Sequence, residues 1–267
     1  MTLTQKERAE SFRALHEGEP FVIPNPWDAG SAKILAGLGF RALATTSGGF
    51  AFSLGKRDGQ VTLDDTRAHV TSLAGATDLP VSVDLENGYG PAPEDAARAI
   101  TAVAEAGAVG GSIEDYDREA GRLYELDEEV ERLAAAVEAA RSLDFPFTLT
   151  ARAENYLRGN PDVDDTIARL RAYDEAGADV LYAPFVIERD DLKAICDAVS
   201  KPVNVLAFGG LGLTLAEIGE LGGQRASIGS ALTWTAMNAA IEAGERLAEG
   251  DFSALTPPDP RIKDWLA

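Results

Sequence analysis

Short runs of apolar, often β-branched residues alternate along the chain with longer alanine-rich stretches in which apolar positions recur every three or four residues. The first pattern is typical of a buried parallel strand, and the second of the amphipathic helix that leads to the next strand. The alternation occurs eight times and predicts a parallel sheet of βα units. We expect strands over Phe21–Pro24, Ala42–Thr46, Val81–Leu85, Gly111–Asp115, Phe147–Arg152, Val180–Ala183, Val203–Ala207 and Ala226–Gly229. We expect helices over Gly30–Leu38, Leu63–Ala74, Pro93–Ala106, Asp127–Leu143, Val163–Ala176, Asp190–Val199, Thr214–Leu221 and Leu232–Glu249.

Eight βα units favour closure into a barrel, and the length of 267 residues suits a barrel that forms one domain. The expected fold is therefore an α/β protein, a (β/α)₈ or TIM barrel, as a single domain over residues 1–267. An open doubly wound sheet is the alternative. Neither GxGxxG nor GxxxxGK[ST], the phosphate-binding signatures of such sheets, follows the first expected strand.

Two segments lie outside the eight units. An N-terminal helix over Thr4–Gly18 could cap the floor of the barrel. The stretch Leu255–Ala267 contains three prolines and predicts an extended arm that carries Trp265. The sequence leaves open whether this arm packs on its own chain or on a neighbouring subunit.

Charge and cysteine content narrow the classes of partner. Lys and Arg number 24 against 44 Asp and Glu, and the resulting net charge of −20 disfavours nucleic acid and anionic membranes as partners. No apolar run approaches the roughly 20 residues that span a bilayer, and the N-terminus has the pattern of an amphipathic helix, so we expect a cytoplasmic protein. The single cysteine, Cys196, allows no intrachain disulfide and no CxxC motif, so a bound metal would need oxygen ligands.

Acidic residues gather where three expected strands end. The third strand has Asp84 and Glu86 at its end, two residues apart on one face of the strand, the fourth has Glu114 at its end, and the fifth ends at Arg152. The carboxyl ends of barrel strands form the active face, and adjacent strands lie about 4.8 Å apart, so the three carboxylates could converge on one point. Such a cluster favours a hard divalent cation such as Mg²⁺. A network of salt bridges with Arg152 is the alternative.

Three further features suit an anionic ligand. Ser47, Gly48 and Gly49 follow the second strand and offer consecutive backbone N–H groups to a carboxylate. Arg152 is a permanent cation that could stabilise an enolate oxygen. The loop SLGKRDGQ carries Asp58 and could fold over the site.

The ordered motifs PNPWDAGSA, TTSGG, GKRDG, DLENGYG, GSIEDY and TARAE together resemble those of the isocitrate lyase and phosphoenolpyruvate mutase superfamily. The resemblance extends from Asn25 to about Asn238. It implies a (β/α)₈ barrel that binds Mg²⁺ or Mn²⁺ and a small 2-oxo or 2-hydroxy acid. It also implies a homo-oligomer, a dimer or tetramer, in which subunits exchange the eighth helix.

The same resemblance assigns roles to residues. Asp84 would be the principal metal ligand, with Glu86, Glu114 and Asp58 acting mostly through water, and Asp58 and Glu114 would take part in catalysis beside Arg152. Arg152 would also contact the substrate. The remaining substrate-binding residues would be Trp27, Ser47, Gly48, Gly49, Tyr89 and Asn204.

Three departures from the family pattern bear on the reaction. The stretch DYDREAGRLYELDEE has neither Cys nor His where the family's lyases carry a cysteine-containing loop, so Tyr124 or Glu119 would have to replace its proton-transfer group. Glu86 stands where Asp is common. The sixth strand ends LYAPF where many lyases have glutamate.

The function that these observations favour is metal-dependent cleavage of a C–C bond, as a lyase or decarboxylase, through an enolate. Two alternatives remain. One is C–P bond chemistry on a phosphonopyruvate-like substrate, by a mutase or hydrolase. The other is a barrel that binds a 2-oxo acid without turning it over.

Overall fold

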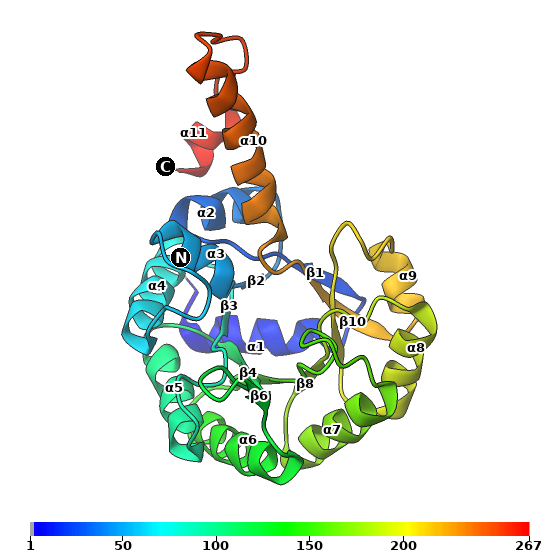
Figure 1. Ribbon diagram of the computed structural model, residues 1–267. Helices are drawn as coiled ribbons and strands as arrows, with labels where there is room; N and C mark the ends of the chain where they lie inside the picture. The colour runs from blue at the N-terminus through cyan, green and yellow to red at the C-terminus, as the bar shows by residue number, and fades with distance from the viewer. Residues whose placement is uncertain (1–2, 267) are drawn as a thin grey trace.

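The computed structural model describes residues 3–266. Eight parallel strands form one sheet in the order β1-β10-β9-β8-β7-β4-β3-β2, surrounded by helices (Figure 1). All eight expected strands are present, and most are one or two residues shorter than expected. Their bounds are β1 Phe21–Ile23, β2 Leu43–Ala44, β3 Val81–Asp84, β4 Gly110–Glu114, β7 Thr148–Arg152, β8 Val180–Tyr182, β9 Val203–Leu206 and β10 Gly223–Ser227.

The sheet closes on itself between β1 and β2. The first strand pairs with the last, β10, through the register Val22 to Ala226. On the other side Ala44 N donates to Pro24 O at 3.1 Å, just beyond the end of β1. A first strand at this position excludes the open doubly wound sheet, in which it lies in the interior of the strand order. The barrel prediction is confirmed.

Seven helices cover the outside of the barrel because each is apolar on one face. In α5, for example, Ala96, Ile100 and Val103 are buried while Arg98 is exposed. The capping-box residues Thr62 and Thr214 fix the starts of α4 and α9. The bounds are α2 Ala29–Gly37, α4 Leu63–Ala76, α5 Pro93–Glu105, α6 Leu126–Arg141, α7 Val163–Ala176, α8 Arg189–Ala198 and α9 Leu215–Glu220.

Helix α1, Gln5–Leu15, lies across the N-terminal end of the barrel, as predicted (Figure 1). Its Phe12 is fully buried, and Gln5 Nε2 donates to the carbonyls of Ala104 and Ala108. After its last turn, His16 reaches the barrel interior and contacts Arg225 Nη1 at 3.1 Å. The helix therefore seals the floor.

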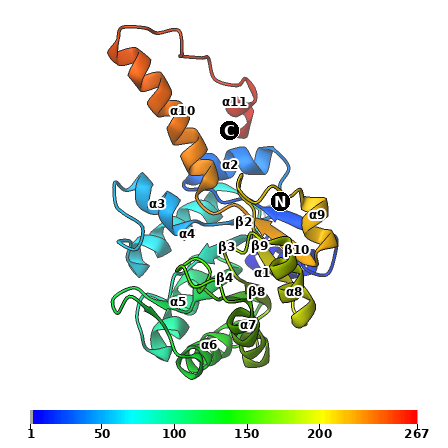
Figure 2. The same cartoon turned by 45° about the vertical axis from the view of Figure 1, so that its right-hand side comes forward.

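The C-terminal segment leaves the barrel. Helix α10, Ala231–Ala248, projects outward, and Thr233 is its one buried residue (Figures 1 and 2). The chain then turns back, and the short helix α11, Arg261–Trp265, lies against α2, where Lys33 Nζ donates to Leu266 O at 3.1 Å. The tail is therefore not wholly extended as expected, and its tryptophan packs on its own chain.

Two other elements were not predicted. Ser47–Ser53 forms a short helix, α3, capped by Thr46, although its glycines have the pattern of a turn. The stretch that replaces the cysteine-containing loop forms a small hairpin of β5, Tyr116–Asp117, and β6, Arg122–Leu123. Of the helices in residues 3–266, none combines the length and apolarity that crossing a bilayer requires.

Candidate active site

A cavity of about 450 Å³ opens at the carboxyl ends of the strands and continues into the barrel. Small polar side chains from three strands, Ser82, Ser112 and Thr150, line its depth, whereas barrel interiors are usually filled by bulky aliphatic residues. Their small volume leaves the space that the cavity occupies. Of the residues predicted for the site, the cavity is lined by Ser47, Gly48, Asp58, Asp84, Arg152 and Asn204.

Arg152, at the end of β7, lies among three carboxylates. Its Nε is 2.6 Å from Glu154 Oε1, its Nη2 is 3.0 Å from Glu114 Oε2, and its Nη1 is 3.3 Å from Asp84 Oδ1. Burial alone would lower the pKa of Arg152, but these carboxylates outweigh burial and raise the pKa well above its ordinary value. Arg152 is therefore a fixed cation beside the cavity.

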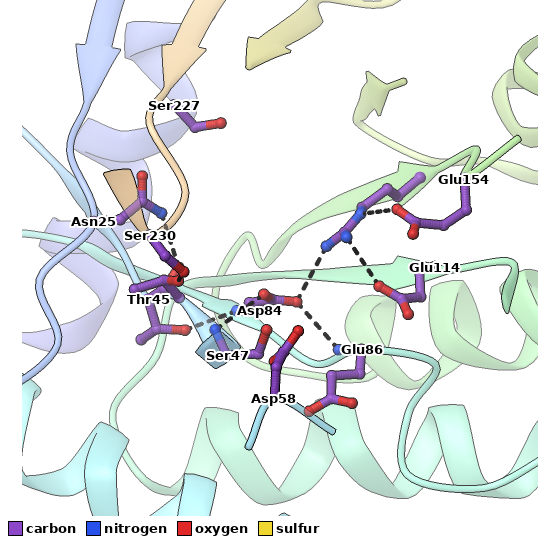
Figure 3. A network of polar contacts seen from close by, with 12 residues as sticks. Asn25, Thr45, Ser47, Asp58, Asp84, Glu86, Glu114, Glu154, Ser227 and Ser230 are labelled. Atoms are coloured by element: carbon purple, nitrogen blue, oxygen red, sulfur yellow. Dashed lines mark hydrogen bonds and ion pairs between the residues drawn. The ribbon is translucent and has the colours of Figure 1, made fainter. Parts of the chain in front are cut away.

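The orientation of Asp84 is set by the backbone around it. Ser47 N donates to Asp84 Oδ2 at 3.2 Å, and Glu86 N donates to Oδ1 at 3.2 Å (Figure 3). The Asp84 N–H in turn donates to Thr45 Oγ1 at 2.9 Å. These contacts hold a partly exposed carboxylate at the cavity wall, with oxygen lone pairs still available to a cation.

Glu86 does not lie where the strand pattern predicted. Strand β3 ends at Asp84, and Glu86 has φ of 50°, so the alternation of side chains no longer applies to it. Its Oε2 is 2.9 Å from Nε of Arg118, a residue of the hairpin. The same guanidinium group is 3.5 Å from Glu114 and 3.7 Å from Asp58.

Arginines thus lie between the acids that we expected to meet at one point. The cluster holds five carboxylates, Asp58, Asp84, Glu86, Glu114 and Glu154, paired with Arg118, Arg152 and Arg158. The salt-bridge network that we gave as the alternative is therefore present. When all five acids are ionised, the five carboxylates and three arginines carry a formal excess of two negative charges, and burial, which raises the pKa of Glu86 and of Glu114, opposes that state.

The imbalance fits a divalent cation. Glu86 Oε1 is buried and has no hydrogen-bond partner, and burial raises the pKa of Glu86 to about 7 despite Arg118. Burial also raises the pKa of Glu114. Within residues 3–266 no three Asp, Glu, His or Cys side chains are grouped so that they alone could hold a metal. Water would have to complete the coordination of an ion at Asp84, as Mg²⁺ readily accepts.

The Ser47–Gly49 segment forms the first turn of α3, and two of its residues, Ser47 and Gly48, line the cavity. The Ser47 amide is already bound to Asp84, and the Gly49 amide donates to Thr46 Oγ1 at 3.3 Å. Gly48 lines the cavity, and a Cβ there would lie 2.8 Å from Ser230 Oγ. The close approach of Ser230 explains why glycine is needed at this position.

The three other residues predicted to line the pocket, Asn204, Trp27 and Tyr89, lie in different places. Asn204 lines the cavity and donates to Ser227 Oγ at 2.9 Å. Trp27 lies behind the wall, next to Gly49. Tyr89 is outside the cavity lining, where its hydroxyl is 2.7 Å from Thr66 Oγ1.

Neither proposed substitute for the missing proton-transfer group reaches the cavity. The Tyr124 hydroxyl accepts from Asn87 Nδ2 at 3.0 Å, and Glu119 is exposed on the hairpin. Both lie outside the cavity lining. The rim is instead largely apolar, formed by Leu157, Pro184, Phe185, Phe208 and Trp234.

Three arginines of this region were missed in the sequence. Arg158 follows Glu154 by four residues, a spacing that could have suggested their 2.7 Å pair. Arg225 directly precedes the predicted strand Ala226–Gly229, and the structure extends this strand back to Gly223, so that Arg225 lies within β10. Arg118 gave no local signal, because only the folded hairpin brings it to Glu86.

Comparisons with known proteins identify the family of the chain. The profile of the family described as phosphoenolpyruvate phosphomutase matches residues 12–248. A crystal structure of a Burkholderia cenocepacia protein, provisionally assigned as a lyase or mutase, is 51% identical over 98% of this chain and 96% of that one, with a TM-score of 0.94. The 2-methylisocitrate lyase of Escherichia coli is 32% identical over 75% of this chain and 70% of its own length. An oxaloacetate decarboxylase of Bradyrhizobium is 30% identical over 85% and 79%, respectively. The chain therefore belongs to the isocitrate lyase and phosphoenolpyruvate mutase superfamily.

Proposed function

We propose that this protein is a divalent-metal-dependent lyase that cleaves a C–C bond of a small 2-oxo or 2-hydroxy acid. The observation that carries the proposal is Arg152, a permanent cation fixed at the wall of the cavity beside a cluster in which five carboxylates face three arginines. The acids would attract a metal ion, and Arg152 keeps N–H donors beyond its three carboxylate contacts that could face an anionic substrate.

Breaking a C–C bond next to a carbonyl group leaves an electron pair that the carbonyl oxygen takes up as an enolate. A fixed cation beside that oxygen stabilises the charge as it develops, which lowers the barrier. Arg152 is the group proposed for this role, because three carboxylates hold its guanidinium in place. Mg²⁺ or Mn²⁺, held by Asp84 and through water by Glu86, Glu114 and Asp58, would act as a Lewis acid on the same oxygen.

The cavity wall explains how a small acid could be oriented. Gly48 allows a carboxylate to approach the first turn of α3, and the apolar rim around Phe185 and Trp234 limits access of water. The relatives named 2-methylisocitrate lyase and oxaloacetate decarboxylase support C–C cleavage. Because neither Tyr124 nor Glu119 reaches the cavity, we expect slow cleavage of isocitrate and 2-methylisocitrate.

A turnover screen with Mg²⁺ or Mn²⁺ tests the proposal. Its substrates are oxaloacetate, isocitrate, 2-methylisocitrate, 2,3-dimethylmalate and phosphonopyruvate. We expect cleavage of at least one C–C substrate, lost with EDTA. Turnover of phosphonopyruvate alone would assign C–P chemistry instead, and metal-dependent binding without turnover would assign a binding protein.

We also propose that the protein is a homo-oligomer, a dimer or tetramer. Helix α10 projects from the barrel with Trp234, Ile241 and Leu247 exposed, where an eighth barrel helix would ordinarily be buried. Exchange of α10 between subunits would cover these side chains. Light scattering at micromolar concentration should give more than the mass of one chain, and a clean monomer would refute the idea.

A further inference from the structure

Arg225, on β10, is a buried arginine without an acidic partner. Only 5% of it is exposed, it lines the same cavity as Arg152, and no carboxylate in residues 3–266 lies within ion-pair distance of it. Its Nε donates to Asn204 Oδ1 at 2.7 Å, and its Nη2 donates to Thr150 Oγ1 at 3.1 Å. Its Nη1 is 3.1 Å from His16 Nε2. Asn204 and Thr150 have neutral side chains, and His16 is also uncharged.

The contact with Arg225 fixes the tautomer of His16. An arginine can only donate, so His16 Nε2 accepts, and the Nδ1–H donates to Phe12 O at 2.9 Å. Burial and the nearby Arg225 lower the pKa of His16 to about 3, so the imidazole is neutral. Burial lowers the pKa of Arg225 to about 10, and it remains a cation at neutral pH. The inner end of the cavity thus has a positive charge without a counter-ion.

An uncompensated buried ion costs several kcal/mol, so a bound anion at this position would relieve a large penalty. Arginine has five N–H donors, and the protein contacts of Arg225 use three of them. Thr150 precedes Arg152 by two residues on β7, which places the Arg225 contact about 7 Å deeper along the strand. This separation suits an acid with two carboxylates joined by a chain of a few carbons.

We propose that Arg225 binds the second carboxylate of a dicarboxylic substrate whose other end lies at Arg152. This inference rests on the proposed function and narrows its substrate to dicarboxylic 2-oxo or 2-hydroxy acids of four to six carbons. Pairing with Arg225 stabilises the ionised carboxylate.

The rival explanation is that Arg225 only anchors the floor helix through His16. Calorimetric titration with two acids of equal carbon number, in the presence of Mg²⁺, separates the two explanations. 2-Oxoglutarate has a second carboxylate where 2-oxopentanoate has a methyl group. Wild-type protein should bind 2-oxoglutarate at least about tenfold more tightly. Arg225→Met should weaken 2-oxoglutarate binding about 100-fold and leave 2-oxopentanoate within about threefold, since truncating a buried charge partner costs several kcal/mol.

Two further variants keep the test decisive. Arg225→Lys retains the charge and should retain part of the preference, and it replaces the methionine variant if circular dichroism shows that variant to be unfolded. His16→Phe removes the floor contact and should leave the preference intact. The proposal is overturned if wild-type protein shows no preference, or if Arg225→Met weakens both acids equally. A preference in titrations without turnover of any acid would refute the proposed function alone.

Discussion

The mouth of the cavity and its inner end have opposite imbalances of charged side chains. At the mouth, Arg152 pairs with three carboxylates, and in the wider cluster five carboxylates face three arginines. At the inner end, Arg225 has only uncharged hydrogen-bond partners. One end is short of a cation and the other of an anion, so a metal ion together with an anionic substrate would satisfy both.

The difference also shows where a barrel tolerates charge. Acids at strand ends have solvent, loops and arginines from several strands within reach, so a cluster can form there. The inner layer is enclosed by neighbouring strands and the floor helix, so a charge there has few partners. An unmatched charge is therefore more informative about ligand binding in the inner layer than at the mouth.

Replacing Arg152 should have the largest effect on catalysis. Arg152→Met removes the proposed stabilising cation and leaves Asp84, Glu114 and Glu154 with less neutralisation, so we expect kcat/KM to fall about 1,000-fold or more on whichever acid is turned over. Arg158→Met is the matched control, because Arg158 pairs with Glu114 and Glu154 but does not line the cavity. An equal loss in both variants would indicate that the arginines only hold the acids together.

Asp84→Asn tests the metal site with little change of shape. The amide can keep an acceptor for Ser47 N but removes the charge, so Mg²⁺ affinity measured by calorimetry should fall more than about 100-fold. Asp64→Asn, at an exposed position of α4, should leave the affinity unchanged. Wild-type affinity in Asp84→Asn would assign the acids to a salt-bridge network alone.

Arg118→Ala should act in the opposite direction. Arg118 pairs with Glu86, Glu114 and Asp58, and its removal would leave two arginines among five carboxylates. We expect Mg²⁺ to bind about tenfold more tightly, in proportion to a contact of about 1.4 kcal/mol. Arg122→Ala, on the same hairpin and paired only with Glu128, is the control. Weaker binding would show that Arg118 orders the acids rather than competing with the metal.

The last expected effect is on stability rather than on metal binding or catalysis, and it concerns the floor. The pKa of His16 is about 3 in the folded protein against 6.5 as its ordinary value, so between these values the unfolded chain takes up a proton that the folded chain does not. His16 therefore does not reduce the free energy of unfolding above pH 6.5. Below pH 6.5 it lowers the free energy of unfolding by at most about 1.4 kcal/mol per pH unit, because only the unfolded chain binds the proton. Glu86, whose pKa is raised to about 7, acts in the opposite sense.

The measurement is therefore a difference between variants. Urea unfolding of wild type and His16→Gln from pH 4 to pH 6.5 should show a flatter pH dependence in the variant, in which Gln can still accept from Arg225. His69, whose pKa burial lowers to about 4, makes a similar contribution in both proteins and cancels. An equal pH dependence of the free energy of unfolding in both proteins would mean that His16 takes up its proton as readily in the folded state as in the unfolded chain.

The sequence predicted the barrel well because hydrophobic periodicity reports directly on burial. It failed at two places where a strand leads into a loop. Ser47–Ser53 is a helix because Thr46 caps it, although its two glycines favour a turn. Glu86 leaves the strand pattern at a positive φ that no local rule required.

For the site, strand-end position predicted Asp84 and Arg152 at the cavity, and the loop pattern predicted Asp58 there. The balance of charge could not be predicted, because Arg118 reaches the acids only through a hairpin of unpredicted shape. The family motifs placed Trp27 and Tyr89 in the pocket. In the structure the Trp27 side chain packs behind the cavity wall, and the Tyr89 side chain lies outside the cavity lining. Strand register specifies which strand end a residue occupies, but not where a loop turns its side chain.

The contact between His16 and Arg225 has a consequence for folding during synthesis, since it joins residues 209 positions apart. Helix α1, which precedes His16, leaves the ribosome first, while β10 is the last strand of the barrel to emerge. Barrel closure between β1 and β10 and the seating of Arg225 on the floor must therefore wait for nearly the whole chain, a topology with many distant contacts that slows folding. Until then β1 presents an unpaired edge, and a nascent chain halted before β10 would have the acidic mouth without its inner cation.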